Sequence, residues 1–165
     1  MPHPDIIRSK QKFDNLKLEY IRTPKIIWDK LIKEFEFTVD ACASDKNALL
    51  PKYWTKEDSA LDHSWDGEIV YCHPMFDNNI PKFVKKAIES KCITVFLLPS
   101  STNSVYFHKY FWDSLTNTPK NNIEVRFLPK PSKHSQYGLK FLTEDNVEPK
   151  FGYLKALMVV IVNNV

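Results

Sequence analysis

Three short segments of this sequence each follow an apolar run and contain residue types that could take part in chemistry. They are Asp40-Ala41-Cys42-Ala43-Ser44, His73-Pro74-Met75-Phe76 and Pro99-Ser100-Ser101-Thr102. Asp40 can accept hydrogen bonds from an amino or hydroxyl group, and the small alanines that follow it would let a ligand approach the backbone. His73 offers a ring nitrogen, Pro74 a carbonyl oxygen and Phe76 an aromatic face for stacking.

The spacing of the glycines, cysteines and histidines argues against several other kinds of site. The three glycines form neither a GxGxxG fingerprint nor a Walker loop, which argues against the usual dinucleotide and triphosphate cradles. The cysteines are odd in number and include no CxxC pair, so we expect reduced core thiols and no disulfide scaffold or zinc ribbon. No metal site is expected, because no pair has metal-ligand spacing. The residues considered are Cys42, Cys72, Cys92, His63, His73 and His108.

The apolar pattern predicts the elements that must position these segments. Strands are expected over residues 37–42, 68–72, 93–98, 123–128 and 154–162. One helix should begin with Thr23 as its cap and Pro24 in its first turn, a second at Pro81, and a third should run from about Ser104 to Leu115. Alternating strands and helices predict an open, mostly parallel α/β sheet, whose carboxyl edge binds ligands. The three segments should therefore meet at that edge.

Length and charge set the domain count and the broad class. The chain has 165 residues, of which 43% are hydrophobic, enough for a single domain with a core. We divide it into a basic arm, residues 1–19, and a domain over residues 20–165. The net charge of +3 suits a nucleic-acid partner without requiring one. Because no stretch approaches the roughly 20 apolar residues of a membrane span, we expect a soluble, intracellular protein and no membrane partner.

Several ordered pieces of the sequence share their spacing with one protein family. These pieces are Tyr20-Ile21-Arg22-Thr23-Pro24, residues 37–43 with Asn47, Tyr53-Trp54-Thr55 with Asp58, Leu61 and Trp65, residues 71–76, Leu97-Leu98-Pro99 with Thr102 and Phe107-His108, and Gly138-Leu139-Lys140-Phe141. Together they resemble the phage DNA N-6-adenine-methyltransferase family over about residues 20–162. The resemblance implies a single-domain, Rossmann-like methyltransferase fold that binds S-adenosylmethionine and double-stranded DNA. It also implies a location in the cytoplasm of a phage-infected bacterium.

The resemblance assigns roles to individual residues. The cofactor would be held by Thr23, Pro24, Asp40, Ala41, Cys42, Ala43 and Asp58. The catalytic segment would be His73-Pro74-Met75-Phe76, which stands in the place of the family's Asn-Pro-Pro-Tyr. An adenine amino group is a poor nucleophile until hydrogen-bond acceptors draw on its protons, and the adenine must first leave the duplex. The family supplies those acceptors with a side chain and a proline carbonyl.

The tetrapeptide departs from the family pattern at two positions that affect catalysis. His73 offers one acceptor nitrogen, and only as one of its neutral tautomers. Met75 replaces a proline whose fixed φ would stiffen the loop. Two alternatives therefore stay open. One is a catalytically inactive binding protein that acts by occupying DNA or a host protein. The other is an enzyme acting on another base or nucleotide, with His73 as its general base.

The predicted DNA-binding residues lie in a segment that mixes cations, hydroxyls and an aromatic ring. They are Lys130, Lys133 and Lys140. A solvated surface loop would have the same composition, and the second helix offers an alternative basic face formed by Lys82, Lys85 and Lys86. The aromatic residues at helical spacing should belong to the core, namely Trp28, Tyr106, Phe107 and Phe111.

Overall fold

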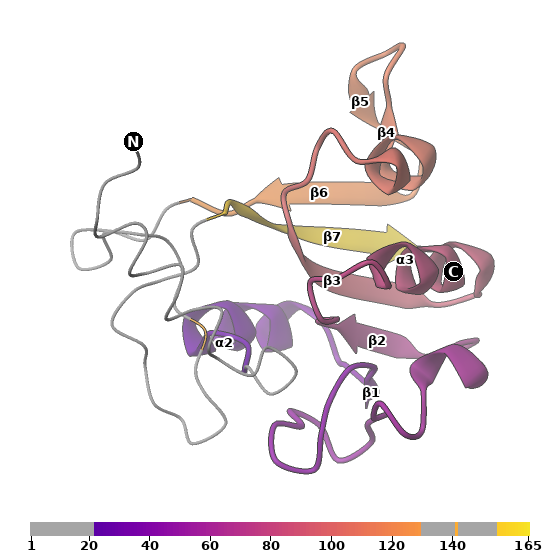
Figure 1. Ribbon diagram of the computed structural model, residues 1–165. Coiled ribbons are helices and arrows are strands. Elements are labelled where there is room, and N and C mark those ends of the chain that lie inside the picture. Colours follow the sequence, from indigo (N-terminus) through magenta and orange to yellow (C-terminus); the bar gives the residue numbers. More distant parts are fainter. Residues whose placement is uncertain (1–21, 130–140, 142–154) are drawn as a thin grey trace.

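The computed structural model describes residues 22–129, residue 141 and residues 155–165 (Figure 1). The basic arm over residues 1–19 lies outside the described residues, as do the predicted DNA contacts Lys130, Lys133 and Lys140. Within the described part of the chain, no helix has the length and apolar character needed to cross a bilayer.

A five-stranded sheet forms the centre of the fold. Its strands, in spatial order, are β1 (Val39–Asp40), β2 (Ile69–Cys72), β3 (Ile93–Pro99), β7 (Leu157–Asn163) and β6 (Ile123–Phe127). β1 pairs with β2 and β2 with β3 in parallel, whereas β7 runs antiparallel to both β3 and β6. Four strands therefore share one direction and β7 alone is reversed (Figure 1).

The sheet is mixed, whereas the sequence predicted a mostly parallel one. Two of its four strand pairs are parallel, as predicted, and the other two are antiparallel. The common direction of β1, β2, β3 and β6 agrees with the prediction, but the insertion of β7 between β3 and β6 makes two pairings antiparallel. An apolar run reads the same in either direction, because burial on both faces removes the alternation of polar and apolar residues. The direction of β7 could therefore not be predicted from its sequence.

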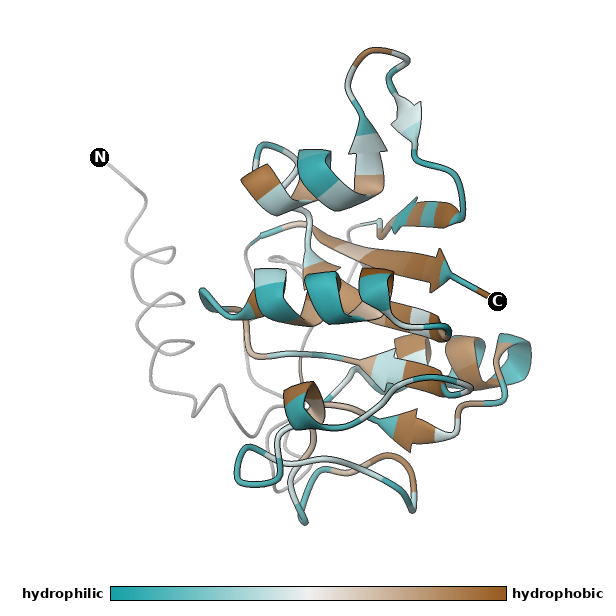
Figure 2. Cartoon of the chain, turned by 90° about the vertical axis from the view of Figure 1, so that its right-hand side faces the viewer, coloured by the Kyte–Doolittle hydropathy of each residue, from teal (hydrophilic) through white to brown (hydrophobic). Residues whose placement is uncertain are grey.

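Helices cover both faces of the sheet. α2 (Lys25–Glu34) buries Ile27 and Leu31 on one face, and α3 (Ile80–Glu89) buries an apolar side on the other. Pro81 lies in the first turn of α3, as predicted. In Figure 2 the long strand at the centre of the sheet is mainly brown, and the helix in front of the sheet carries teal residues on its outward side. A short 3-10 helix, η2 (Ala60–Asp62), packs against α3 on the same face.

The region after β3 differs from its prediction. The expected helix from Ser104 to about Leu115 is limited to a short helical segment whose last part is η3 (Phe107–Phe111). A hairpin of β4 (Trp112–Asp113) and β5 (Thr118–Pro119) follows it. The Asp113 carboxylate accepts the backbone N–H groups of Leu115 and Thr116 at 2.9 and 3.4 Å, and this local bonding competes with a helix.

The predicted core aromatics agree with the structure in their burial. Tyr106, Phe107 and Phe111 are buried. Trp28 is half-buried on α2, and its ring contacts the Tyr71 ring at a centroid distance of 5.0 Å. These rings fill the two hydrophobic layers, so they are not available as stacking platforms for a ligand.

Candidate functional site

The carboxyl ends of β1 and β2 lie side by side and form the edge at which the candidate site is built. The two strands are parallel with Asp40 opposite Tyr71, and the Ala41 N–H donates to the Tyr71 carbonyl at 2.8 Å. Because parallel neighbours end at the same edge, the segments after Asp40 and after Cys72 emerge together. The predicted meeting of these two segments is confirmed.

A cavity of about 290 Å³ opens between these segments. This volume is close to the lower limit of about 300 Å³ for small-molecule sites. Its walls come from the loop after β1, the tetrapeptide after β2, the segment before and within η2, and the start of α3. The lining residues are Ala41, Cys42, Ala43, Asn47, Thr55, Lys56, Ser59, Ala60, Leu61, His73, Pro74, Met75, Asp77, Asn79 and Phe83. The cavity thus combines small, polar and apolar side chains.

Asp40 is buried behind this cavity and holds the loop that forms its wall. Its carboxylate accepts the backbone N–H groups of Cys42 and Leu49 at 3.3 and 3.1 Å, and the residue is 3% exposed. Burial raises the pKa of Asp40 to about 6, against the lowering effect of those two hydrogen bonds. Asp40 lines a smaller adjoining cavity, together with Thr23 and His73, and does not line the larger one.

Thr23 takes part in the site and does not cap α2. Its hydroxyl lies 2.6 Å from the Tyr71 hydroxyl and 3.1 Å from His73 Nδ1. Pro24 occupies the N-cap position, and its carbonyl accepts the N–H groups of Ile27 and Trp28 at 2.9 and 3.1 Å. The prediction of a Thr23 cap is therefore wrong, because a buried partner on β2 engages its hydroxyl.

His73 is a neutral, nearly buried ring at the boundary of both cavities. It is 9% exposed, and its ring stacks on Phe141 and lies tilted against Phe76, each at a centroid distance of 5.4 Å. Burial lowers the pKa of His73 to about 4, so the ring is uncharged at neutral pH. Its Nδ1 atom is engaged by Thr23, whereas Nε2 has no hydrogen-bond partner among the described residues.

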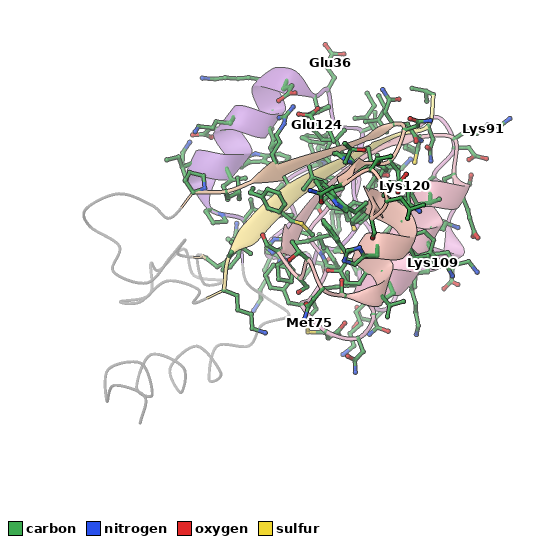
Figure 3. The ribbon with its side chains drawn as sticks, turned by 90° about the horizontal axis from the view of Figure 1, so that it is seen from above. Glu36, Met75, Lys91, Lys109, Lys120 and Glu124 are labelled. Carbon is green, nitrogen blue, oxygen red and sulfur yellow. The ribbon has the colours of Figure 1, made fainter. Side chains whose placement is uncertain are left out.

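The remaining tetrapeptide residues have different environments. The Pro74 carbonyl accepts no hydrogen bond from the described part of the chain, and Pro74 is a buried residue of the cavity lining. Met75 is 37% exposed at the cavity rim, and Figure 3 shows it at the edge of the domain away from Glu36. Phe76 is half-buried, with its ring edge-on to Phe141 at 5.9 Å. Packing thus orients the Phe76 ring.

Asp58 lies outside the cavity lining, although its neighbours belong to it. Its carboxylate is bonded to His63 Nε2 at 2.7 Å, and the His63 ring stacks on Trp54 at 4.9 Å. The Thr55 hydroxyl accepts the Asp58 N–H at 3.1 Å. Asp58 thereby shapes the turn that carries Thr55 and Ser59 to the cavity.

The cysteines are free thiols, as predicted, and two of them lie at the site. Cys42 and Cys72 place their sulfur atoms 3.7 Å apart, and Cys42 lines the cavity. Burial raises the pKa of the Cys72 thiol well above its usual value, so this thiol is protonated at neutral pH. Within the described residues, no three His, Cys, Asp or Glu side chains are grouped as metal ligands.

Comparison with known proteins identifies the family. A model of the DNA N-6-adenine-methyltransferase (Dam) family matches residues 11–163. The chain belongs to this family. No curated protein and no solved structure matches it. Membership of the DNA N-6-adenine-methyltransferase family confirms the resemblance described from the sequence.

Several contributors to this methyltransferase-family site were not predicted from the sequence, among them Tyr71, Phe141 and Lys56. Tyr71 reaches Thr23, Phe141 stacks on His73, and Lys56 reaches the cavity wall from a segment with little regular structure. A sequence signal existed for Tyr71, because residues two apart on a strand face the same side, and Tyr71 precedes His73 by two. Phe141 ends the Gly138-Leu139-Lys140-Phe141 piece of the family resemblance, but that piece does not indicate its contact with His73. No local pattern indicates Lys56, because its position depends on long-range packing.

Proposed function

We propose that this protein transfers a methyl group from S-adenosylmethionine to N6 of adenine in double-stranded DNA. The observation that carries the proposal is the cavity at the carboxyl edge of β1 and β2, which is lined by Pro74, a residue whose carbonyl has no hydrogen-bond partner among the described residues. The family assignment suggests the same chemistry. The transfer forms the N6–methyl bond, breaks the cofactor's sulfur–methyl bond to leave the demethylated thioether, and releases one amino proton to solvent.

The residues at the cavity fit S-adenosylmethionine in their chemistry. The small side chains Ala41, Ala43 and Ala60 leave space near the backbone, while Thr55 and Ser59 offer hydroxyl groups. Cys42, which lines the cavity, also contacts the cofactor in this proposal. Four other residues support the cavity walls from behind or from the side, namely Thr23, Pro24, Asp40 and Asp58. When bound, the cofactor supplies an electrophilic methyl group.

Pro74 is the principal catalytic acceptor in this proposal. Its carbonyl oxygen accepts a hydrogen bond from the adenine amino group, which makes the nitrogen lone pair more available as the bond to the methyl forms. Met75 and Phe76 border the position of the extruded base, and a ring at Phe76 can contact its face. These are positioning roles, because neither side chain exchanges a proton.

A general-base role for His73 fits the site poorly. A general base works best when its pKa is near the working pH. Burial lowers the pKa of His73 to about 4, so the ring has little affinity for a proton at neutral pH. An enzyme that relies on His73 as a base is therefore not favoured over amino-group methylation.

The DNA contacts and the cellular setting complete the proposal. Lys130, Lys133 and Lys140 remain the proposed phosphate contacts, since a basic loop would neutralise backbone charge. Of the alternative basic face on α3, Lys85 pairs with Glu89 and Lys86 donates to the Leu61 carbonyl at 3.2 Å. Those two lysines therefore have structural partners. We infer action in the cytoplasm of a phage-infected bacterium.

The decisive experiment is methyl transfer followed by nucleoside analysis. The full chain is incubated with tritiated S-adenosylmethionine and unmethylated duplex DNA, and the DNA is digested to nucleosides. Label in N6-methyldeoxyadenosine supports the proposal, and label in another nucleoside overturns the choice of base. Binding of cofactor and DNA without transfer would instead support the rival, a protein that acts by occupying DNA or a host partner.

A further inference from the structure

Three buried side chains from two segments that are far apart in the sequence form a hydrogen-bonded series that ends at the cavity. Tyr71 on β2 lies 2.6 Å from the Thr23 hydroxyl, which precedes α2, and Thr23 lies 3.1 Å from His73 Nδ1. The exposed fractions of these residues are 0% for Tyr71, 5% for Thr23 and 9% for His73. Water is therefore largely excluded from these three side chains, and their polar groups must satisfy their hydrogen bonds with one another.

The direction of these hydrogen bonds follows from counting protons. Tyr71 and Thr23 each have one hydroxyl proton, and Thr23 is the only described hydrogen-bond partner of the Tyr71 hydroxyl. If Thr23 donated to Tyr71, the fully buried Tyr71 proton would have no acceptor, which is costly. The nearby Asp40 carboxylate has no hydrogen bond to Tyr71 and instead accepts two backbone N–H groups. Tyr71 therefore donates to Thr23. Among the described residues, His73 Nδ1 is the remaining partner of the buried Thr23 hydroxyl and the acceptor for its proton, so Thr23 donates to His73.

We propose that Tyr71 and Thr23 hold His73 in the tautomer whose proton is on Nε2, so that His73 presents a hydrogen-bond donor at the cavity border. Nδ1 accepts from Thr23 and carries no proton. A neutral imidazole has one N–H proton, which must then be on Nε2. Nε2 has no hydrogen-bond partner among the described residues. Tyr71 and Thr23 are positioning residues, because they act through His73.

This polarity is the reverse of the acceptor role expected from the sequence. A protonated Nε2 cannot accept a hydrogen bond from an adenine amino group. It can donate to a ring nitrogen, and adenine has one, N1, next to its amino group. The second half of the inference rests on the proposed function: Pro74 accepts from N6, and His73 Nε2–H donates to N1. Pro74 and His73 would then each form a hydrogen bond with the Watson–Crick edge of the extruded base.

The tautomer can be measured without any enzymatic assay. Long-range proton–nitrogen NMR spectra of the full, nitrogen-15-labelled protein distinguish protonated from unprotonated ring nitrogens. We expect His73 to show a protonated Nε2 and an unprotonated Nδ1 at neutral pH. His108 is an internal reference, because its Nε2 lies 2.7 Å from the Thr102 carbonyl, which can only accept. His73→Gln and His108→Gln variants assign the two signals.

Two substitutions at Thr23 test the cause of the tautomer. Thr23→Val keeps the shape but removes the donor, and should convert His73 to a mixture of tautomers, while Thr23→Ser should keep the wild-type pattern. His108 should be unchanged in both variants. A wild-type His73 with its proton on Nδ1 would overturn the inference, as would a Thr23→Val spectrum identical to that of the wild type.

The hydrogen bond to N1 is tested separately with modified DNA. Duplexes containing 1-deazaadenine lack the N1 acceptor, whereas 7-deazaadenine retains it and serves as the control. We expect the methylation rate to fall about tenfold on 1-deazaadenine, as for removal of one hydrogen bond to the reacting base. Equal rates on both modified duplexes would refute the bond to N1 while leaving the tautomer intact. Absence of methylation on ordinary DNA would instead refute the proposed function.

Discussion

The Asp40 carboxylate accepts the backbone N–H of Leu49 at 3.1 Å and thereby closes the loop that forms one wall of the cavity. The same carboxylate also accepts the Cys42 N–H at 3.3 Å. The loop is further braced where the Asn47 side-chain oxygen accepts the Ser44 N–H at 2.6 Å. A buried acidic group thus organises the cavity wall, and its ionisation links the stability of the fold to pH.

Stability should fall as pH rises through the titration of Asp40. Its pKa is about 6 in the folded protein against 3.8 as the ordinary value, so folding favours the protonated form. The contribution is fully present below pH 3.8 and is lost as pH rises through about 6, with a maximum near 3 kcal/mol. The free energy of unfolding of Asp40→Asn, measured with urea, should lack this pH-dependent contribution between pH 4 and 7. The matched control, Asp29→Asn at a half-exposed side chain, should retain it.

Filling the cavity should weaken cofactor binding without unfolding the protein. In the wild type, S-adenosylmethionine at a hundredfold excess over Kd should stabilise the fold by about 2.7 kcal/mol. Ala43→Leu places a larger side chain in the cavity wall and should weaken the calorimetric affinity at least tenfold, about 1.4 kcal/mol. Ala156→Leu, at an exposed alanine, should bind normally. Equal affinity of both variants would place the cofactor elsewhere.

Removing the His73 ring should slow methyl transfer while leaving cofactor affinity nearly unchanged. His73→Ala removes one hydrogen bond to the base, so kcat should fall tenfold to a hundredfold, about 1.4–2.7 kcal/mol. The double change His73→Asn with Met75→Pro should raise the rate of a weakly active wild type, because it returns a side-chain acceptor and a fixed φ. Wild-type methylation that is indifferent to His73→Ala would show that His73 makes no hydrogen bond to the reacting base.

Duplex DNA binding should weaken steeply with salt, because neutralisation of phosphates by lysines releases counterions. Replacing Lys130, Lys133 and Lys140 by Ala should reduce the slope of log K against log salt by about 0.9 for each phosphate that a lysine no longer neutralises. The comparison variant, Lys82→Ala with Lys85→Ala, removes two charges from α3 and should leave the slope unchanged. A reversed result, with the slope reduced only by the α3 changes, would move the DNA surface to that helix.

The sequence alone determined those helices and strands whose pattern of apolar residues fits only one type of secondary structure. The continuous apolar run of β3 and the one-sided apolar face of α3 were predicted with bounds close to the observed ones. The approach of the segments after Asp40 and Cys72 was also predictable, because the carboxyl ends of parallel strands meet at one edge. These features depend on local order and on a general rule of sheet topology.

Only the tertiary structure decided the reversal of β7, the burial of Asp40 and the partners of His73. Thr23 had a plausible local role as a helix cap, but a long-range bond to Tyr71 replaced it. The tautomer of His73 depends in turn on that bond. Hydrogen-bond direction and desolvation are set by groups far apart in the chain, so neither can be read from residue types and spacing.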